Sequence, residues 1–66
     1  MDPIYKDIVV QLSGEDGNAF SIIARVSQAL KRGGVTKEEI KKFQDEAVSG
    51  DYDNVLRTAL KWVMVS

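Results

Sequence analysis

Residues 13–20, Ser-Gly-Glu-Asp-Gly-Asn-Ala-Phe, separate two different hydrophobic patterns in this 66-residue chain and therefore decide its fold. Before them, apolar and polar residues alternate as in a strand, and after them apolar residues recur at helical spacing. The two glycines permit backbone angles that cost other residues energy, while Asp16 and Asn18 can accept hydrogen bonds from the first N–H groups of a helix. The stretch predicts a sharp junction between a strand and a helix.

The segment before the junction, residues 4–12, predicts a strand. Its period of two places Ile8, Val10 and Leu12 on one face. Val9 and Gln11 lie on the other face. We expect the first face to be buried and the second to be open to solvent.

The segment after the junction predicts an amphipathic helix over residues 19–32. Its apolar residues form one broad stripe: Ala19, Ile22, Ile23, Val26, Ala29 and Leu30. Lys31 and Arg32 fall in the last turn, where the helix dipole favours cations. Gly33-Gly34 then supplies a glycine that can end the helix.

A second helix is expected to begin at residue 36 or 37. Thr36 is the expected N-cap, and Glu39 lies three residues further on, as in a capping box. Val35 and Ile40 form the apolar pair that flanks such a cap. Ser49-Gly50 ends the helix.

A third helix is expected to begin at residue 51 or 52, with Asp51 as a candidate N-cap. Its end is open to two interpretations, because the helical spacing continues to Val63 while residues 62–65, Trp-Val-Met-Val, also favour a strand. We prefer the strand, since a lone first strand would leave its backbone groups unpaired.

These elements predict a single small α+β domain over residues 1–66, in the order β-α-α-α-β. The two strands are expected to form a two-stranded antiparallel sheet that packs on three short helices. Because such a sheet is weak by itself, helix packing must supply most of the stability. Phe20 and Phe43 are expected in the core.

The composition excludes several kinds of chemistry. Cysteine and histidine are absent, which excludes zinc sites built from thiolates and imidazoles, cysteine nucleophiles and histidine general bases. Nine basic and ten acidic residues give a net charge of -1, so no overall positive field attracts nucleic acid or anionic lipid. No apolar stretch approaches the roughly 20 residues that cross a bilayer, and the first residues lack a signal-peptide pattern. We predict a soluble, cytoplasmic protein.

Carboxylates and glycines near the junction offer three candidate sites. Ser13, Glu15, Asp16 and Asn18 carry oxygen ligands of the kind that Ca²⁺ or Mg²⁺ takes, but the EF-hand order is absent. The same loop with Asp51 and Asp53 offers a hydrolytic centre, yet helix capping accounts for these acids. A phosphate loop at Gly14 and Gly17 lacks the lysine-serine pair, and the adjacent acids repel phosphate. We predict no catalytic, metal-ligating or cofactor-binding residue and no cofactor.

Two surfaces are candidates for binding another macromolecule. The first combines the open sheet face with aromatic side chains at its rim, and its residues are Val9, Gln11, Tyr52, Trp62, Val63 and Val65. The second is a basic patch around the turn between the first two helices, formed by Lys31, Arg32, Lys37, Lys41 and Lys42. We predict a non-enzymatic interaction module that binds a protein partner or a second copy of itself. The alternative is a nucleic-acid-associated phage accessory protein that uses the basic patch.

Three segments give the chain a likeness that covers nearly its whole length. They are Gly14-Glu15-Asp16-Gly17-Asn18-Ala19-Phe20, Ser49-Gly50-Asp51-Tyr52-Asp53 and Lys61-Trp62-Val63. With them the chain resembles a family of very small, uncharacterised bacterial and phage proteins that share G-x-D-G-N-A-F and S-G-D-Y-D segments. That family has no established activity, cofactor or catalytic residue, so the resemblance implies a bacterial or phage origin and no particular chemistry.

Overall fold

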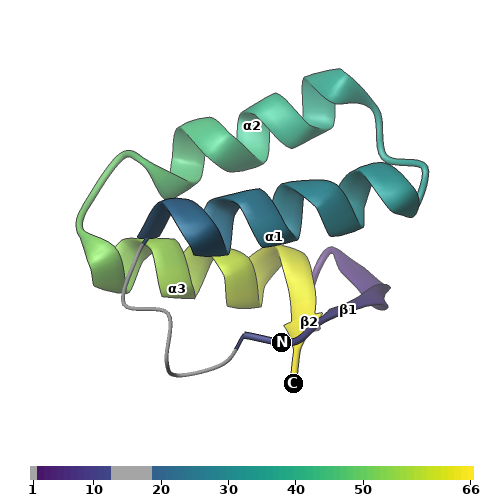
Figure 1. The fold of residues 1–66 in the computed structure, drawn as a ribbon, viewed down its shortest axis with the longest axis horizontal. Coiled ribbons are helices and arrows are strands. Elements are labelled where there is room, and N and C mark those ends of the chain that lie inside the picture. The colour runs from purple at the N-terminus through teal and green to yellow at the C-terminus, as the bar shows by residue number, and fades with distance from the viewer. Residues whose placement is uncertain (1, 13–18) are drawn as a thin grey trace.

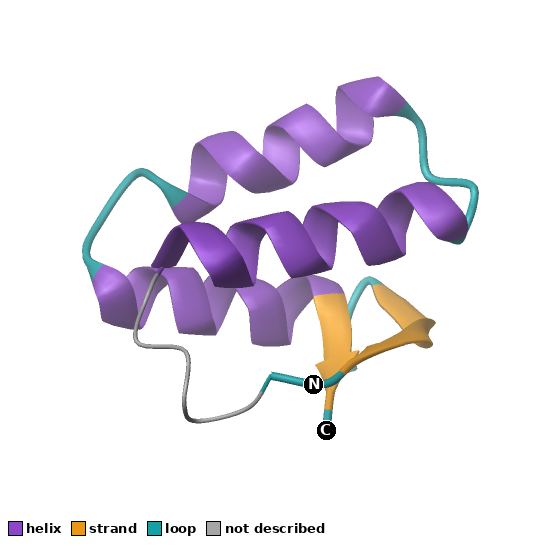
Figure 2. Cartoon of the chain, viewed as in Figure 1, coloured by secondary structure: helices purple, strands orange, loops and turns teal. Residues whose placement is uncertain are grey.

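Within residues 2–12 and 19–66, which a computed structural model describes, the chain forms two strands and three helices (Figure 1 and Figure 2). In chain order they are β1 (Tyr5–Val10), α1 (Ala19–Arg32), α2 (Lys37–Ala47), α3 (Tyr52–Trp62) and β2 (Val63–Val65). The predicted α+β class and the β-α-α-α-β order are confirmed. The closing strand is confirmed as well, although the helix before it continues through Trp62. No helix in these described ranges is both long enough and apolar enough to span a bilayer.

Capping side chains set the starts of α2 and α3. The Glu39 N–H donates to Thr36 Oγ1 at 3.3 Å, and the Asn54 N–H donates to Asp51 Oδ1 at 3.0 Å. Each capping oxygen satisfies one of the N–H groups that a helix start leaves without an internal partner. The N-caps predicted at Thr36 and Asp51 are confirmed, and each helix begins at the following residue.

A glycine turn ends α1. The Gly34 N–H donates to the Lys31 carbonyl at 3.1 Å, and the Val35 N–H donates to the Leu30 carbonyl at 3.0 Å. These two bonds form a Schellman motif, which requires left-handed backbone at Gly34, where φ is 86°. Gly34 is therefore the glycine that the turn needs.

Asn54 and Glu46 tie the end of α2 to α3. Asn54 Nδ2 donates to the carbonyls of Glu46 at 2.9 Å and Ala47 at 3.2 Å, which belong to the last turn of α2. The Glu46 carboxylate accepts from Lys61 Nζ at 2.9 Å and from Trp62 Nε1 at 3.3 Å. One turn of α2 is thus bonded to both the first and the last turn of α3.

The three helices pack against one another around one core, and the sheet packs on α1 and α3 (Figure 1). The largest fully buried side chains are Phe43, Leu30, Val26 and Val63. Trp62 is 5% exposed, and its ring centroid lies 5.9 Å from that of Tyr5 and 5.8 Å from that of Phe43. Trp62 therefore connects β1, α2 and α3 within the core.

The two phenylalanines have opposite environments. Phe43 is fully buried, so its expected place in the core is confirmed. Phe20 is 75% exposed, so the same expectation for Phe20 is wrong. Its position on α1 lies away from the buried stripe, which consists of Ile22, Ile23, Val26 and Leu30.

The strands β1 and β2 run parallel, so the predicted antiparallel sheet is wrong. Consecutive helices run in opposite directions (Figure 1), so the two reversals from α1 to α2 and from α2 to α3 leave α3 running in the direction of α1. Parallel strands need a long crossover connection, and the three helices supply it. The helices between the strands therefore provide the connection that the parallel pairing needs.

The pairing of the strands is irregular on the side of β1. Tyr5 pairs with Val63, and the next pair is Val9 with Met64, so β1 has three residues between these pairs and β2 has none. The bulged residues include Ile8, whose Cδ1 lies 2.7 Å from the place that a Cβ on Gly33 would occupy. The bulge thus packs Ile8 against the end of α1.

Candidate functional site

The sheet carries part of the predicted interaction surface. Val9 and Gln11 are exposed and Val65 is half-buried, and all three lie on or next to the paired strands. Trp62 and Val63 are buried, so they support the sheet from inside and present no surface. The exposed Tyr52 begins α3, at the opposite end from β2, and lies about 15 Å along the helix from it.

Val9 and Met64 form the exposed face of the sheet. They are register partners on the two strands, and directly opposed side chains project to the same face. Val9 is 63% exposed and Met64 is 44% exposed. Sequence reasoning did not assign Met64 to this surface. The alternation over residues 63–65 places it there once the helix is known to end at Trp62.

The outer edge of β1 faces away from β2. The Ser66 N–H donates to the Val10 carbonyl at 3.0 Å on the β2 side, so the backbone groups of Val9 and Gln11 point to the opposite side. There Arg25 Nη1 donates to the Gln11 carbonyl at 3.3 Å. The end of the strand segment is therefore joined to α1 by a guanidinium group.

The five residues of the predicted basic patch fall into two groups. Lys31 and Arg32 end α1 and Lys37 begins α2, on the two sides of the glycine turn. Lys41 and Lys42 lie further along α2, and Lys42 Nζ donates to Glu39 Oε1 at 3.3 Å. The structure brings Lys31 and Lys37 to one hollow and leaves Lys41 and Lys42 outside its lining.

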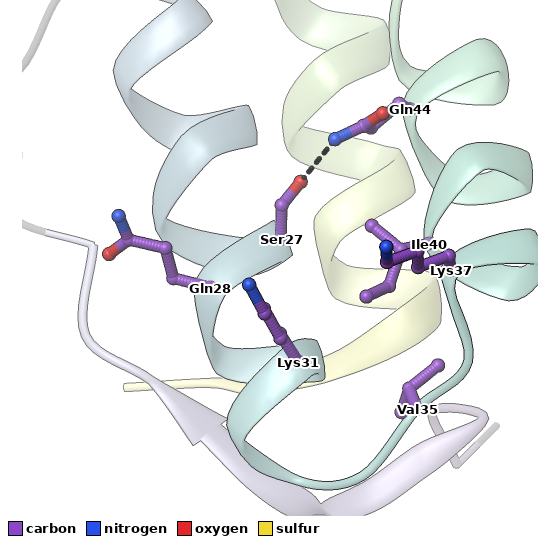
Figure 3. Close-up of a pocket in the computed structure, with 7 residues that line it drawn as sticks. All are labelled: Ser27, Gln28, Lys31, Val35, Lys37, Ile40 and Gln44. Carbon is purple, nitrogen blue, oxygen red and sulfur yellow. Dashed lines mark hydrogen bonds between the residues drawn. The ribbon is translucent and has the colours of Figure 1, made fainter.

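This hollow, about 320 Å³ in volume, lies between α1 and α2 (Figure 3). Its lining residues are Ser27, Gln28, Lys31, Val35, Lys37, Ile40 and Gln44. Gln44 Nε2 donates to Ser27 Oγ at 3.0 Å, which joins the two helices beside the hollow. Val35 and Ile40 give it an apolar wall, and two lysines flank that wall.

A second hollow of about 270 Å³ lies between α1 and β1. Its lining residues are Val9, Val10, Gln11, Arg25, Gln28, Ala29 and Arg32. Gln28 lines both hollows, so they adjoin on either side of this residue. We call the surface of the two hollows the basic face; its charged residues are Arg25, Lys31, Arg32 and Lys37. The described residues that line it include no aspartate or glutamate.

A third hollow, about 210 Å³ in volume, lies where α1 and α3 begin and α2 ends. Three exposed apolar side chains line it: Phe20, Val48 and Tyr52. It is separate from the basic face, because no residue lines both.

Two carboxylates near α3, those of Asp51 and Glu46, have structural contacts. Asp51 caps the helix, and Glu46 binds Lys61 and Trp62. The hydrogen bond from the Lys61 ammonium lowers the pKa of Glu46 from its usual value, burial opposes this shift, and the bond from Trp62 adds to it. Within residues 2–12 and 19–66, no three histidine, cysteine, aspartate or glutamate side chains are placed to hold a metal ion. The metal and phosphate candidates at Ser13–Asn18 lie outside the described residues.

Comparisons with protein-family models, with curated proteins and with solved structures gave no match to this chain. The candidate surfaces therefore rest on the geometry of the chain itself.

Proposed function

We propose that this chain is a non-enzymatic binding module that contacts a protein partner through the exposed face of its sheet. The observation that carries the proposal is the apolar pair Val9 and Met64, which the strands hold in solvent beside the outer edge of β1. Exposed apolar groups on a rigid strand pair are typical of contacts between proteins, and a strand edge can add a strand from a partner.

The carboxylates support binding over hydrolysis. A hydrolytic centre needs carboxylates that converge on a substrate or a metal ion. The contacts of Glu46 and Asp51 are instead made to groups that hold α2 and α3 in place. Glu46 and Asp51 thus have structural uses.

A different protein suits this face better than a second copy of the chain. A stable interface needs about 800 Å² from each partner, which is about a sixth of the 4646 Å² surface of the chain. Two copies that joined through this sheet face would also each place near the contact the Arg32 that lines the same hollow as Val9. Like charges at such a contact oppose self-association.

The test uses the double variant Val9→Lys/Met64→Lys, which changes exposed side chains and leaves the core intact. Leu60→Lys, on the exposed side of α3 at 59% exposure, is the matched control. The tagged chain and both variants are used for affinity capture from source cells, followed by mass spectrometry. We expect a protein that binds the original chain and the control and is lost with the double variant.

Capture of the same proteins by the double variant would contradict the proposal. Sedimentation velocity tests whether a second copy of the chain, instead of a different protein, binds the sheet face. A dimer of the original chain that the double variant separates would show that the sheet face binds another copy of the chain.

A further inference from the structure

The basic face begins at the proposed contact surface. Val9, on the exposed sheet face, also lines the 270 Å³ hollow, together with Arg25 and Arg32 of α1. A partner segment that contacts Val9 therefore lies beside two guanidinium groups. The 320 Å³ hollow, with Lys31 and Lys37, follows on the other side of Gln28.

The positive charges of Lys31, Arg32 and Lys37 on this face lack an ion-pair partner among the described residues. The ion pairs among the described residues are Lys42 with Glu39 and Lys61 with Glu46, and neither involves these three side chains. Lys31, Arg32 and Lys37 thus have no carboxylate within 4.0 Å in the described part of the chain. Because the whole chain has a net charge of -1, the basic face is a local feature that attracts a local group of negative charges.

The lining of the 320 Å³ hollow favours a peptide over a nucleic-acid backbone. Val35 and Ile40 form the apolar part of the lining beside Lys37, and Lys31 lies across the hollow on α1 (Figure 3), so an aliphatic side chain can enter this space between charged groups. Nucleic-acid affinity depends on the number of phosphates that are neutralised, and Lys41 and Lys42 lie outside this face. A small number of cations around an apolar lining suits a peptide segment with acidic side chains on either side of one aliphatic side chain.

We infer that the basic face binds an acidic, extended segment of the partner protein. Its carboxylates lie against Lys31, Arg32 and Lys37, and one aliphatic side chain enters the hollow between α1 and α2. This inference rests on the proposed function, because it names the chemistry of the partner segment that lies next to the sheet face.

The test is an amide-resonance titration of the ¹⁵N-labelled chain by NMR. The probe is the peptide acetyl-Glu-Glu-Leu-Glu-Glu-amide at up to millimolar concentration, and acetyl-Gln-Gln-Leu-Gln-Gln-amide is the uncharged control. We expect the acidic peptide alone to shift the resonances of Gln28, Lys31, Val35 and Lys37. Added salt should weaken the binding, since exposed charges are screened.

Charge variants locate the site. Lys31→Glu/Lys37→Glu should lower the affinity about tenfold or more, because each exposed ion pair contributes a factor of a few. Lys41→Glu/Lys42→Glu is the matched control and should keep the affinity. Lys31→Gln/Lys37→Gln removes the same charges with less disturbance of the helix ends, and circular dichroism checks that each variant is folded.

Two results would overturn the inference. Either the acidic peptide produces no shifts, or an oligodeoxythymidylate shifts the same resonances at lower concentration, which would assign the face to phosphates. Neither result decides the proposed function, because the double variant Val9→Lys/Met64→Lys tests that separately.

Discussion

The bonds from Asn54 to the end of α2 provide the sharpest test of how the helices are joined. Asn54→Ala removes the donor that contacts the Glu46 and Ala47 carbonyls at 2.9 and 3.2 Å. The Glu46 carbonyl keeps a bond from Ser49 Oγ at 2.7 Å, so the Ala47 carbonyl loses more. The variant therefore tests the hydrogen-bonded connection between α2 and α3 without changing the side chains of the core.

The expected loss follows from the two bonds. Each contributes about 1 kcal/mol net, and the higher helix propensity of alanine returns about 0.5 kcal/mol. We expect a loss of about 1.5 kcal/mol in the free energy of unfolding, which corresponds to about 9 °C in Tm for a domain of this size. Asn54→Asp should lose at least as much, since its carboxylate oxygens face carbonyl oxygens and donate no hydrogen bond.

Urea unfolding followed by tryptophan fluorescence measures this loss. Trp62 is the single tryptophan, and it is buried, so its emission reports exposure of the core. Arg57→Ala, an exposed position on the same helix, is the control and should change stability by less than about 0.5 kcal/mol. If Asn54→Ala unfolds at the same urea concentration as Arg57→Ala, the bonds from Asn54 to the end of α2 do not hold α3 to α2.

Three further predictions concern the pH response, the core and the glycine turn. The pKa of Glu46 is lower in the folded chain than its usual 4.5, so its stabilising contribution is present above that value and is lost as the pH falls through the folded pKa. Urea midpoints of the original chain and Glu46→Gln should therefore converge as the pH falls from neutral to below 4.5, and a constant difference would contradict the assignment. Leu30→Ala should cost about 3 kcal/mol because Leu30 is fully buried, whereas Leu60→Ala, at an exposed position, should cost less than about 0.5 kcal/mol by the same measurement. Gly34→Ala should raise the energy of the folded backbone by about 1 kcal/mol, because alanine adopts a φ of 86° only at a cost. A Cβ at this position meets no atom within 4 Å, so no steric clash adds to that cost. An unchanged Tm would show that the turn adjusts.

The sequence was sufficient to predict the end of α1 and the starts of α2 and α3, because the interactions that set them are local. Thr36 and Asp51 each accept a hydrogen bond from an N–H three residues further on. Gly34 closes a turn within five residues of Leu30. Residue types at short spacing encode such contacts directly, so the predicted starts of α2 and α3 agree with the structure.

Strand direction and side-chain exposure depend on contacts between distant segments. The parallel pairing depends on how the three helices between β1 and β2 pack, and no local signal in either strand specifies it. Phe20 was assigned to the core by its size, although its helical position already placed it off the buried stripe. For Phe20, the helical spacing was a better guide to exposure than the size of the side chain.

The candidate site was predictable in part. Lys31 and Lys37 flank a short turn, so their proximity follows from the sequence, and they do line one hollow. The hollow that joins Val9 to Arg32 requires β1 to pack beside α1, and neither segment has a local signal for that contact. Met64 was missed because its side depends on where α3 ends.

The parallel arrangement of β1 and β2 also determines how the chain resists mechanical force. Tyr5 begins β1 at one end of the sheet, and Val65 ends β2 at the other, beside its partner Val10. Tension applied through the two termini therefore pulls the strands past each other, and their inter-strand bonds share the load in shear. An antiparallel pair of the same strands would be peeled apart one bond at a time. The three-residue bulge in β1 provides slack that such a pull would take up before the load reaches the bonds beyond it.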